Sequence, residues 1–346
     1  MIRNSVVVTG VTSFLGYHIA RTFAAADYGV IGTYCTPPQR LDSLRRTRWD
    51  RLQSSLTMCL PLDVTDADKV RDLIAAHRPQ LWIHQAGLGK NFASVRYDIA
   101  EATRIGLLPL ESIYENLAAT GGALLATGSG MEYGTADCPH AEDGECLPES
   151  PYGLAKLTMT LRCRQLAHHY RVPTRIARVY TVLGELDAPD RLVARIFEQL
   201  CKGERIGVAP GVSRDVCDVA DLAVGYLRIA ADIARGPLFD IFNLSRGVAV
   251  PLFDLAKLAA RQLQINPDLI FQDPAMVRAG ESPAVYGDSR KALARLGWAA
   301  RPVADGLLRL ARGKSSISKS WLSLSETPSG VPRSSGSDNV RRCGTA

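Results

Sequence analysis

The chain has 346 residues, of which 46% are hydrophobic and 22% charged, and its formal net charge is +6. This composition is typical of a globular protein with enough apolar residues for one large domain or two lobes, and no apolar run is long enough to span a membrane. Five basic and two acidic residues from Gly313 onward carry +3 of the charge, so the rest of the chain is only weakly basic and does not indicate a nucleic-acid-binding surface.

The eight cysteines are scattered, without a CxxC motif or a cluster of histidines and cysteines. Free thiols in a reducing cytosol explain this pattern better than disulfide bonds or a zinc site, so no metal is expected. The first residues, MIRNSVVVTG, lead at once into a strand-like run, so no signal peptide is expected either. The sequence therefore predicts a cytoplasmic protein.

Strand-like and helix-like segments alternate along the first half of the chain. Strands are expected at residues 5–10, 28–34, 56–66, 80–87, 122–130 and 173–180, and helices at 14–26, 67–77, 98–121 and 152–170. Alternation of this kind implies parallel pairing through right-handed crossovers. The predicted fold class is therefore α/β, with a doubly wound parallel sheet of the Rossmann type.

Beyond about Gly184 the pattern is less regular, with helix signals at 191–203, 219–234 and 252–264. We expect residues 1–184 to form a dinucleotide-binding domain and 185–312 a smaller mixed substrate lobe, some strands of which return to the large sheet. Residues 313–346 are rich in serine and poor in large apolar residues, which predicts a disordered tail.

The first strand-to-helix turn, VVVTGVTSFLG, has the spacing of a phosphate-binding loop. Gly10 would allow a tight turn and Gly16 close packing of helix on sheet, while Ser13 takes the place of the middle glycine. A helix N-terminus offers N–H groups to a pyrophosphate, so dinucleotide binding is favoured over a plain turn. The loop residues concerned are Gly10, Thr12, Ser13, Phe14, Leu15 and Gly16.

The end of the second strand, IGTYCTPPQR, has no acidic residue for a ribose 2′-hydroxyl, whereas Arg40 could pair with a 2′-phosphate. This favours NADP over NAD, although Arg40 could equally be a solvated loop residue. Further along the chain, Asp63 and Val64 are candidates for the adenine end of the cofactor. Ala86 and Gly87 are candidates for a small-residue floor beneath it, and both pairs could also be plain strand ends.

Tyr152 and Lys156 are four residues apart and share one face of a helix that starts behind Pro151. An ammonium group close to a phenol stabilises the phenolate, so the pair can give and take a proton beside a carbonyl or alcohol. Ser129 follows a strand end, where open α/β sheets bind ligands, and could hydrogen-bond the same substrate oxygen. A lone YxxxK pattern arises by chance, but here the three features occur together and in order.

Together these features resemble the short-chain dehydrogenase/reductase superfamily in its extended form, which acts on nucleotide sugars. The resemblance covers about residues 1–312 and implies that Ser129, Tyr152 and Lys156 are catalytic, with Tyr152 and Lys156 also contacting the cofactor. It further implies a homodimer formed by the 98–121 helix and the helix of Tyr152. Thr103 stands where the family often has an asparagine, so that role stays unassigned.

Two later segments are similar to substrate-binding segments of the family. SRDVCDVAD contains Arg214 and MVRAGESPAVYGD contains Arg278, and the resemblance implies that both bind substrate, Arg278 through the diphosphate. GSGMEYG and MVRAGESPAVYGD look most like the reductases that convert GDP-4-keto-6-deoxy-D-mannose to GDP-D-rhamnose. The segment from Val179 to Thr181 departs from the PFN usual in that group.

The sequence thus predicts an enzyme that uses NAD(P)H to reduce the C4 keto group of a nucleotide-linked 4-keto-6-deoxy sugar. Two alternatives remain, a 4-epimerase with tightly bound NAD and a non-catalytic NADP-sensing protein, and the complete trio disfavours the second. A 4,6-dehydratase is disfavoured because Gly130 and Met131 follow Ser129, and Glu132 falls one place late for the acid of an elimination. A GDP-fucose synthase is disfavoured because no cysteine stands beside the serine.

Overall fold

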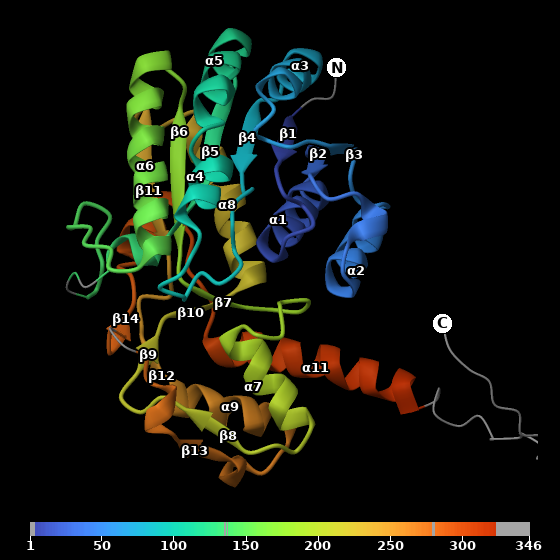
Figure 1. Ribbon diagram of the computed structural model, residues 1–346, viewed down its shortest axis with the longest axis vertical. Helices are drawn as coiled ribbons and strands as arrows, with labels where there is room; N and C mark the ends of the chain where they lie inside the picture. Colours follow the sequence, from blue (N-terminus) through green and yellow to red (C-terminus); the bar gives the residue numbers. More distant parts are fainter. Residues whose placement is uncertain (1–3, 135, 137, 279–280, 323–346) are drawn as a thin grey trace, which may run out of the picture.

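A computed structural model describes residues 4–134, 136, 138–278 and 281–322, with side chains as far as Gly313. At its centre is a seven-stranded sheet in the order β11-β6-β5-β4-β1-β2-β3, with every pair parallel (Figure 1). The strands are β1 (Ser5–Val8), β2 (Gly29–Tyr34), β3 (Met58–Pro61), β4 (Leu81–His84), β5 (Ala123–Ser129), β6 (Thr174–Val179) and β11 (Phe239–Leu244). The predicted doubly wound parallel sheet is confirmed.

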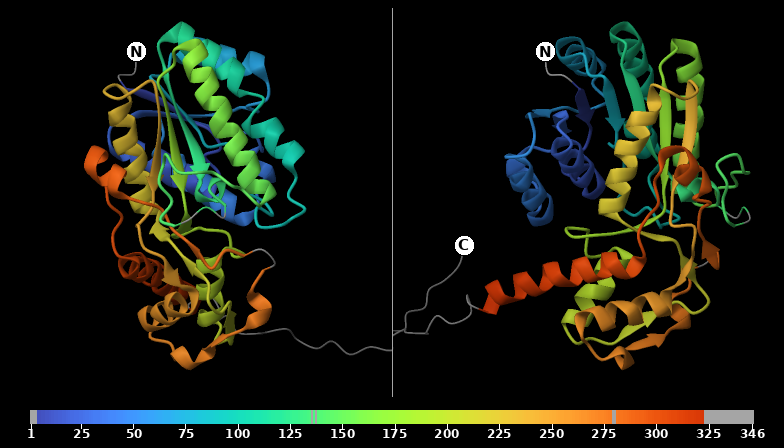
Figure 2. Two further views of the ribbon diagram at one scale, coloured as in Figure 1. Left: turned by 90° about the vertical axis from the view of Figure 1, so that its left-hand side faces the viewer. Right: turned by 180° about the vertical axis from the view of Figure 1, so that it is seen from behind.

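Helices cover both faces of this sheet because successive side chains of a strand point to opposite sides. Val7 belongs to the core beneath α3, α5 and α6, whereas Val6 and Val8 belong to the core beneath α1 and α8. These helices are α1 (Phe14–Ala25), α3 (Ala67–His77), α5 (Leu110–Thr120), α6 (Pro151–Tyr170) and α8 (Val219–Ile233). Figure 2 shows the sheet between the two layers.

The helix expected over 98–121 is wrong as a single element. It is two helices, α4 (Ile99–Gly106) and α5, and Pro109 is the residue before α5. Proline has no backbone N–H and its ring clashes with the preceding turn, which explains the break. A further helix, α2 (Ser43–Leu52), was not expected, because its sequence SLRRTRWDRL has almost no apolar stripe.

The second lobe has its own core, formed by α7 (Leu192–Cys201), α9 (Leu252–Leu263), α11 (Val303–Leu322) and short strands. Its strands are β7 (Thr181–Leu183), β8 (Ile206–Val208), β9 (Ser213–Arg214), β10 (Val216–Asp218), β12 (Val250–Pro251), β13 (Ile270–Gln272) and β14 (Ala284–Val285). Between these elements the chain returns to the large domain, where α8 covers the sheet, β11 pairs with β6, and α10 (Arg290–Leu296) lies nearby. The described residues also form four short 3-10 turns: η1 (Pro38–Arg40), η2 (Gly130–Glu132), η3 (Pro267–Leu269) and η4 (Pro274–Met276).

Helix α11 continues to Leu322, past the point where the sequence places the start of the tail. Extending a helix that already exists costs much less than starting one, which accounts for this overrun. Residues 323–346, the rest of the predicted tail, lie outside the described residues. In the part of the chain that the structure describes, every helix is too short or too polar to cross a membrane.

The carboxyl ends of β1, β4, β5 and β6 face the second lobe (Figure 1). The strand order reverses between β1 and β4, since the chain adds β2 and β3 on one side and β4, β5 and β6 on the other. In open parallel sheets the ligand lies at such a switch point. The loops after these strands therefore form the candidate site.

Candidate active site

Ser129 is the last residue of β5 and the N-cap of η2. Its Oγ accepts a hydrogen bond from the Met131 N–H at 3.1 Å, and its own N–H donates to a carboxylate oxygen of Glu132 at 2.8 Å. The hydroxyl oxygen is thus held as an acceptor, which leaves the hydroxyl proton free for a ligand. The side chain is 5% exposed, so its orientation is well fixed.

Glu132 supports this arrangement from within the protein. Its other oxygen pairs with the Arg178 guanidinium at 2.8 Å, and the two side chains are almost fully buried. Arg178 also lies over the Tyr133 ring at 4.4 Å. The sequence did not identify this pair, because 46 residues separate its members.

Helix α6 brings Tyr152 and Lys156 to the same edge of the sheet. Ser150 caps this helix by accepting the Gly153 N–H at 3.0 Å. A Cβ on Gly153 would lie 2.3 Å from the Met131 carbonyl oxygen, so the first turn of α6 can touch η2 only because this residue is glycine. The contact places Tyr152 beside the loop that follows Ser129.

Lys156 lies between the ends of β4 and β5. Its Nζ donates to the Thr127 carbonyl at 2.9 Å, and a Cβ on Gly87 would be 3.9 Å from the same nitrogen. Thr9 fixes the end of β4 here, since its hydroxyl accepts the N–H groups of Gln85 and Ala86 at 2.9 and 2.8 Å. The ammonium group is therefore anchored on a rigid strand edge.

Two aromatic rings from the loop after β4 contact the Tyr152 ring edge-on. The centroid of Phe92 is 5.6 Å from that of Tyr152, and the centroid of Tyr97 is 5.5 Å from it. Tyr97 is itself held by a bond from its hydroxyl to the Leu88 carbonyl at 2.8 Å. The Tyr152 hydroxyl has no hydrogen-bond partner within the described ranges, so it is available to a substrate. The sequence missed Phe92 and Tyr97, because aromatic residues in a loop have no periodicity to reveal them.

The loop from Gly10 to Gly16 has the shape of a phosphate cradle. Gly10 has a φ of 66°, which favours glycine, and a Cβ on Gly16 would lie 2.4 Å from the Gly10 carbonyl oxygen. Ser13 is the N-cap of α1, and within the described residues its hydroxyl accepts only the Gly16 N–H, at 3.1 Å. The N–H groups of Phe14 and Leu15 have no acceptor among the described atoms, so the first turn of α1 fits a pyrophosphate.

An arginine other than the one that the sequence suggested contacts a side chain of this loop. Arg40 is exposed, and its side chain has no hydrogen bond or ion pair among the described residues. Arg45, at the start of α2, is half-buried, and its Nη2 donates to the hydroxyls of Thr12 and Thr36 at 3.1 and 3.4 Å. Arg45 was not predicted as a site residue, because the helix α2 on which it lies was itself not expected.

The remaining cofactor candidates lie at strand ends. Asp63 is exposed, and its pKa is lowered chiefly by the hydrogen bond from the Thr65 N–H at 3.0 Å. Val64 is 5% exposed and packs in the core beneath α3, so only its backbone can meet a ligand. A Cβ on Gly10 would be 3.4 Å from the Ala86 Cα, which places Ala86 against the phosphate loop.

In the second lobe, arginines gather beyond this edge. Arg214 donates to the carbonyls of Ser213 and Ser282 and pairs with Glu281 at 2.5 Å, and burial lowers its pKa. Arg278 is exposed and lies close enough to lower the pKa of both Arg214 and Arg195, although burial is the larger cause for each. Three neighbouring arginines with one paired carboxylate favour an anionic ligand. Arg195, on α7, was missed by the sequence analysis.

The departure at Val179–Thr181 has a structural consequence. A Cβ on Gly130 would be 2.6 Å from the ring of Tyr180, so this ring fills the space beside the residue after Ser129. Tyr180 also stacks on His140, with centroids 6.1 Å apart. Thr103, at the position of the family asparagine, lies on α4, and its carbonyl accepts the N–H groups of Leu107 and Leu108 at 2.9 and 3.1 Å.

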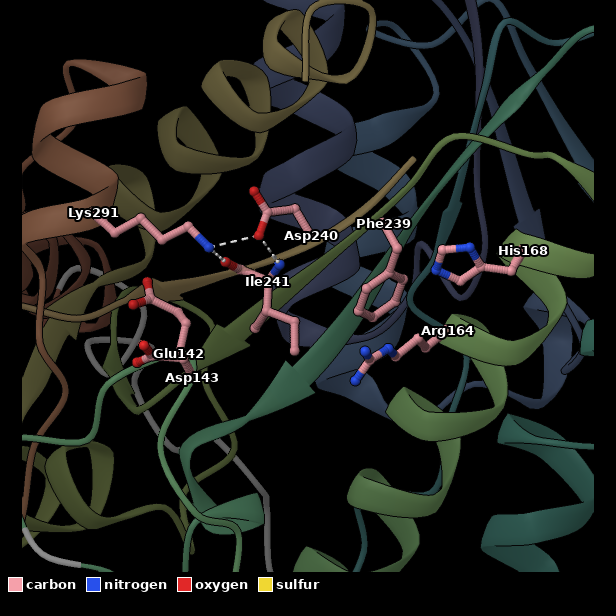
Figure 3. Close-up of a pocket in the computed structure, with 8 residues that line it drawn as sticks. All are labelled: Glu142, Asp143, Arg164, His168, Phe239, Asp240, Ile241 and Lys291. Atoms are coloured by element: carbon pink, nitrogen blue, oxygen red, sulfur yellow. Dashed lines mark hydrogen bonds and ion pairs between the residues drawn. The ribbon is translucent and has the colours of Figure 1, made fainter. Parts of the chain in front are cut away.

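A separate cavity of about 230 Å³ lies at the outer edge of the sheet (Figure 3). Phe239, Asp240 and Ile241, which line it, belong to the first half of β11, whereas Ser129 stands at the carboxyl end of β5. Lys291 is already paired there with Asp240 at 2.6 Å. This cavity is therefore distinct from the candidate active site.

Comparison with known proteins supports the same family. The model of the "NAD dependent epimerase/dehydratase family" matches residues 6–245. The chain is 27% identical to a GDP-6-deoxy-D-mannose reductase of Pseudomonas aeruginosa, over 84% of this chain and 90% of that one. It is 26% identical to a UDP-glucuronate 4-epimerase of Arabidopsis thaliana, over 87% and 72% of the two chains.

Among solved structures, a UDP-glucuronic acid 4-epimerase from Bacillus cereus, in complex with UDP-glucuronic acid and NAD, is similar in fold. The TM-score is 0.79 at 18% identity, and the match covers 90% of this chain and 99% of that one. The chain therefore belongs to the NAD dependent epimerase/dehydratase family and is an enzyme of the oxidoreductase type, as its sequence predicts.

Proposed function

We propose that the protein is an NADPH-dependent reductase of the C4 keto group of a nucleotide-linked 4-keto-6-deoxy sugar. GDP-4-dehydro-6-deoxy-D-mannose is the proposed substrate and GDP-D-rhamnose the product, in line with the similarity to a GDP-6-deoxy-D-mannose reductase. The observation that best supports the proposal is the contact of α6 with η2, in which Gly153 lies against Met131, two residues after Ser129. Lys156, on the same helix, donates to Thr127, two residues before Ser129.

The residues suit a carbonyl reduction. A bound dihydronicotinamide cofactor supplies the hydride for C4. Ser129 donates its free hydroxyl proton as a hydrogen bond to the carbonyl oxygen, and Tyr152 transfers its phenolic proton to that oxygen as the negative charge develops. Lys156, held by the Thr127 carbonyl, stabilises the phenolate that remains until solvent returns the proton.

The structure around Ser129 argues against an elimination. The space beside Gly130 is filled by the Tyr180 ring, so an acidic side chain has no room there. Glu132 has 0% exposure and is engaged by Arg178 and the Ser129 N–H, so it cannot serve as a base for substrate. These features support a reductase over a 4,6-dehydratase.

NADPH is the proposed cofactor because a cation stands where the second strand ends. The Arg45 guanidinium lies against Thr12 of the phosphate loop and Thr36 beyond β2. A planar guanidinium suits a 2′-phosphate, and this position matches the ribose end of a dinucleotide bound on α1. Arg40 remains a second candidate for the same role.

A 4-epimerase is the second candidate function, since a UDP-glucuronate 4-epimerase matches the chain at 26% identity, close to the 27% of the reductase. An epimerase keeps NAD through purification and interconverts two reduced sugars without net use of NADPH. A reductase must release oxidised cofactor at each turnover, so it should purify largely free of dinucleotide.

The test is to extract bound dinucleotide and then follow NADPH consumption with a panel of 4-keto-6-deoxy sugar nucleotides. We expect consumption of NADPH one-for-one with keto sugar, and Tyr152→Phe should lower turnover by orders of magnitude with little change in NADPH affinity. Retained NAD together with no NADPH use on any keto sugar would overturn the reductase.

A further inference from the structure

Arg48 is a buried cation without a carboxylate partner in the described part of the chain. It lies on α2, its residue is 4% exposed, and burial lowers its pKa to about 10. Its guanidinium donates instead to two backbone carbonyls. Nη1 donates to Thr12 at 2.9 Å, Nε donates to Leu186 at 3.0 Å, and Nη2 donates to the same Leu186 oxygen.

The two carbonyls belong to different parts of the site. Thr12 lies in the phosphate loop, between Gly10 and Gly16. Leu186 lies in the segment 184–190, which connects β7 to α7 in the second lobe. Leu186 has a φ of 63°, a conformation that residues with a side chain seldom adopt. The paired bonds from Arg48 hold it there.

The same segment has further contacts with α1 and α2. The His18 ring meets the Glu185 carbonyl at 3.1 Å, Arg51 pairs with the Glu185 carboxylate at 2.9 Å, and a Cβ on Gly184 would lie 3.2 Å from the Phe14 ring. None of these three contacts involves the backbone of the phosphate loop. Arg48, which bonds the same segment at Leu186, also donates to the loop backbone at the Thr12 carbonyl.

The residue that follows the segment is connected to the proposed catalytic tyrosine through a phenylalanine ring. Arg191, the residue before α7, donates to the Gly89 carbonyl at 3.0 Å and lies over the Phe92 ring at 4.2 Å. Phe92 in turn contacts Tyr152. One turn further along α7 is Arg195, which is close to Arg278 on the substrate side.

We propose that Arg48 is a positioning residue that couples the dinucleotide site to the segment 184–190 and to the start of α7. A guanidinium is a rigid planar fork, and a buried N–H left without an acceptor is costly. The Thr12 and Leu186 carbonyls therefore cannot move independently, so a dinucleotide that restrains the phosphate loop also orders the wall of the sugar-nucleotide site. The proposal rests on the proposed function only in taking residues 10–16 as the dinucleotide site.

The test is amide hydrogen exchange of the peptide 184–192, measured with and without saturating NADP⁺ and, separately, NAD⁺. In the wild-type protein the cofactor that binds should slow exchange of this peptide severalfold. In Arg48→Met the cofactor should still bind, more weakly, but without slowing exchange there. Arg48→Lys, which keeps a charged donor, should restore part of the effect.

Arg51→Ala is the matched control, because Arg51 lies on the same helix and contacts the same segment but not the phosphate loop. It should show the wild-type slowing. Equal slowing in Arg48→Met and wild type, or no slowing in wild type that binds cofactor, overturns the coupling. If Arg48→Met does not fold, the same comparison is made between Arg48→Lys and Arg51→Ala, and equal slowing in these two overturns it as well. Failure of wild type to bind either dinucleotide would instead refute the proposed function.

Discussion

Glu132 shows how a single buried residue supports Ser129, the proposed catalytic serine. One of its oxygens accepts the Ser129 N–H and the other pairs with Arg178, which is 2% exposed. The free-energy cost of burying these two charges is offset only while both are present, because the loss of one leaves the other unpaired in a medium of low polarity. A substitution of Glu132 should therefore affect both the stability of the fold and the orientation of Ser129.

We expect Glu132→Gln to lower the free energy of unfolding by about 3 kcal/mol, since breaking a buried ion pair typically costs that much. Chemical denaturation followed by circular dichroism measures the change. Glu111→Gln is the control, because the pair of Glu111 with Arg162 is largely exposed and should contribute little. Equal, small effects of both substitutions would show that the Glu132 pair does not stabilise the fold.

His84, the last residue of β4, makes stability depend on pH. It is 1% exposed, and burial, followed by the nearby Lys156 ammonium, lowers its pKa to about 4. The folded protein therefore keeps this histidine neutral, whereas the unfolded chain protonates it near pH 6.5. The free energy of unfolding is therefore not reduced by this group above pH 6.5. As the pH falls toward 4, protonation of His84 in the unfolded chain lowers the free energy of unfolding by about 3 kcal/mol in total.

Melting temperatures measured between pH 7 and 4 should thus fall less steeply in His84→Gln than in the wild-type protein. His169→Gln, which removes an exposed histidine from α6, should keep the wild-type slope. Asp187 acts in the opposite direction. Burial raises its pKa to about 6, so the folded protein binds this proton more tightly than the unfolded chain does, and the stability gained from that difference is lost as the pH rises from 4 to 6. An unchanged slope in His84→Gln would mean that His84 is not held neutral.

At the scale of elements, the start of α2 decides which arginine contacts the proposed cofactor site. Asp42 caps this helix by accepting the Arg45 N–H at 2.8 Å. The cap sets the first turn of α2 so that Arg45 and Arg48 both hydrogen-bond Thr12, one at its hydroxyl and one at its carbonyl. Arg40 belongs to the preceding turn η1 and points to solvent.

Arg45→Ala should therefore raise the KM for NADPH at least tenfold, by the loss of about 1.4 kcal/mol or more of binding energy, while the KM for NADH changes little. Only NADPH carries the 2′-phosphate that the guanidinium would pair with. Arg40→Ala is the internal comparison and should leave both values nearly unchanged. If Arg40→Ala raises the KM for NADPH and Arg45→Ala does not, the assignment passes to Arg40.

At the scale of the whole molecule, the outer face of α6 is unusually apolar for a free surface. Leu154 and Leu161 are 48% and 55% exposed and lie seven residues apart, on one side of the helix. Leu108, just before α5, is 66% exposed. Exposed apolar patches of this kind favour association, and the family resemblance implies pairing of these helices in a homodimer.

We expect Leu161→Glu to convert a dimer to a monomer, because association would bury the introduced charge without a partner. Multi-angle light scattering after gel filtration gives the mass directly. Leu293→Glu on α10, where the leucine is 56% exposed, should leave the dimer intact. A monomeric wild-type protein, or a dimer that survives Leu161→Glu, would exclude this face as the interface.

The sequence by itself determined the strands of the large sheet, most of the helices around it and the order of the chemical groups along them. Alternating strands and helices predict the parallel sheet, because hydrophobic periodicity reports local conformation. The glycines at 10 and 16 predict the cradle, since a Cβ on Gly16 has no room. Ser129, Tyr152 and Lys156 were identified because each stands at a fixed place in its own strand or helix.

Only the tertiary structure decided which distant side chains converge on that frame. Arg178 reaches Glu132, and Phe92 and Tyr97 contact Tyr152. Arg48 joins Thr12 to Leu186, which is 138 residues from Arg48 along the chain. α2 was missed because its apolar stripe is nearly absent. α4 and α5 were predicted as one helix because the helical pattern of the sequence continues across Pro109, where the structure has a break. Crossovers between parallel strands bring such residues together, and their pairing has no local periodicity from which it could be predicted.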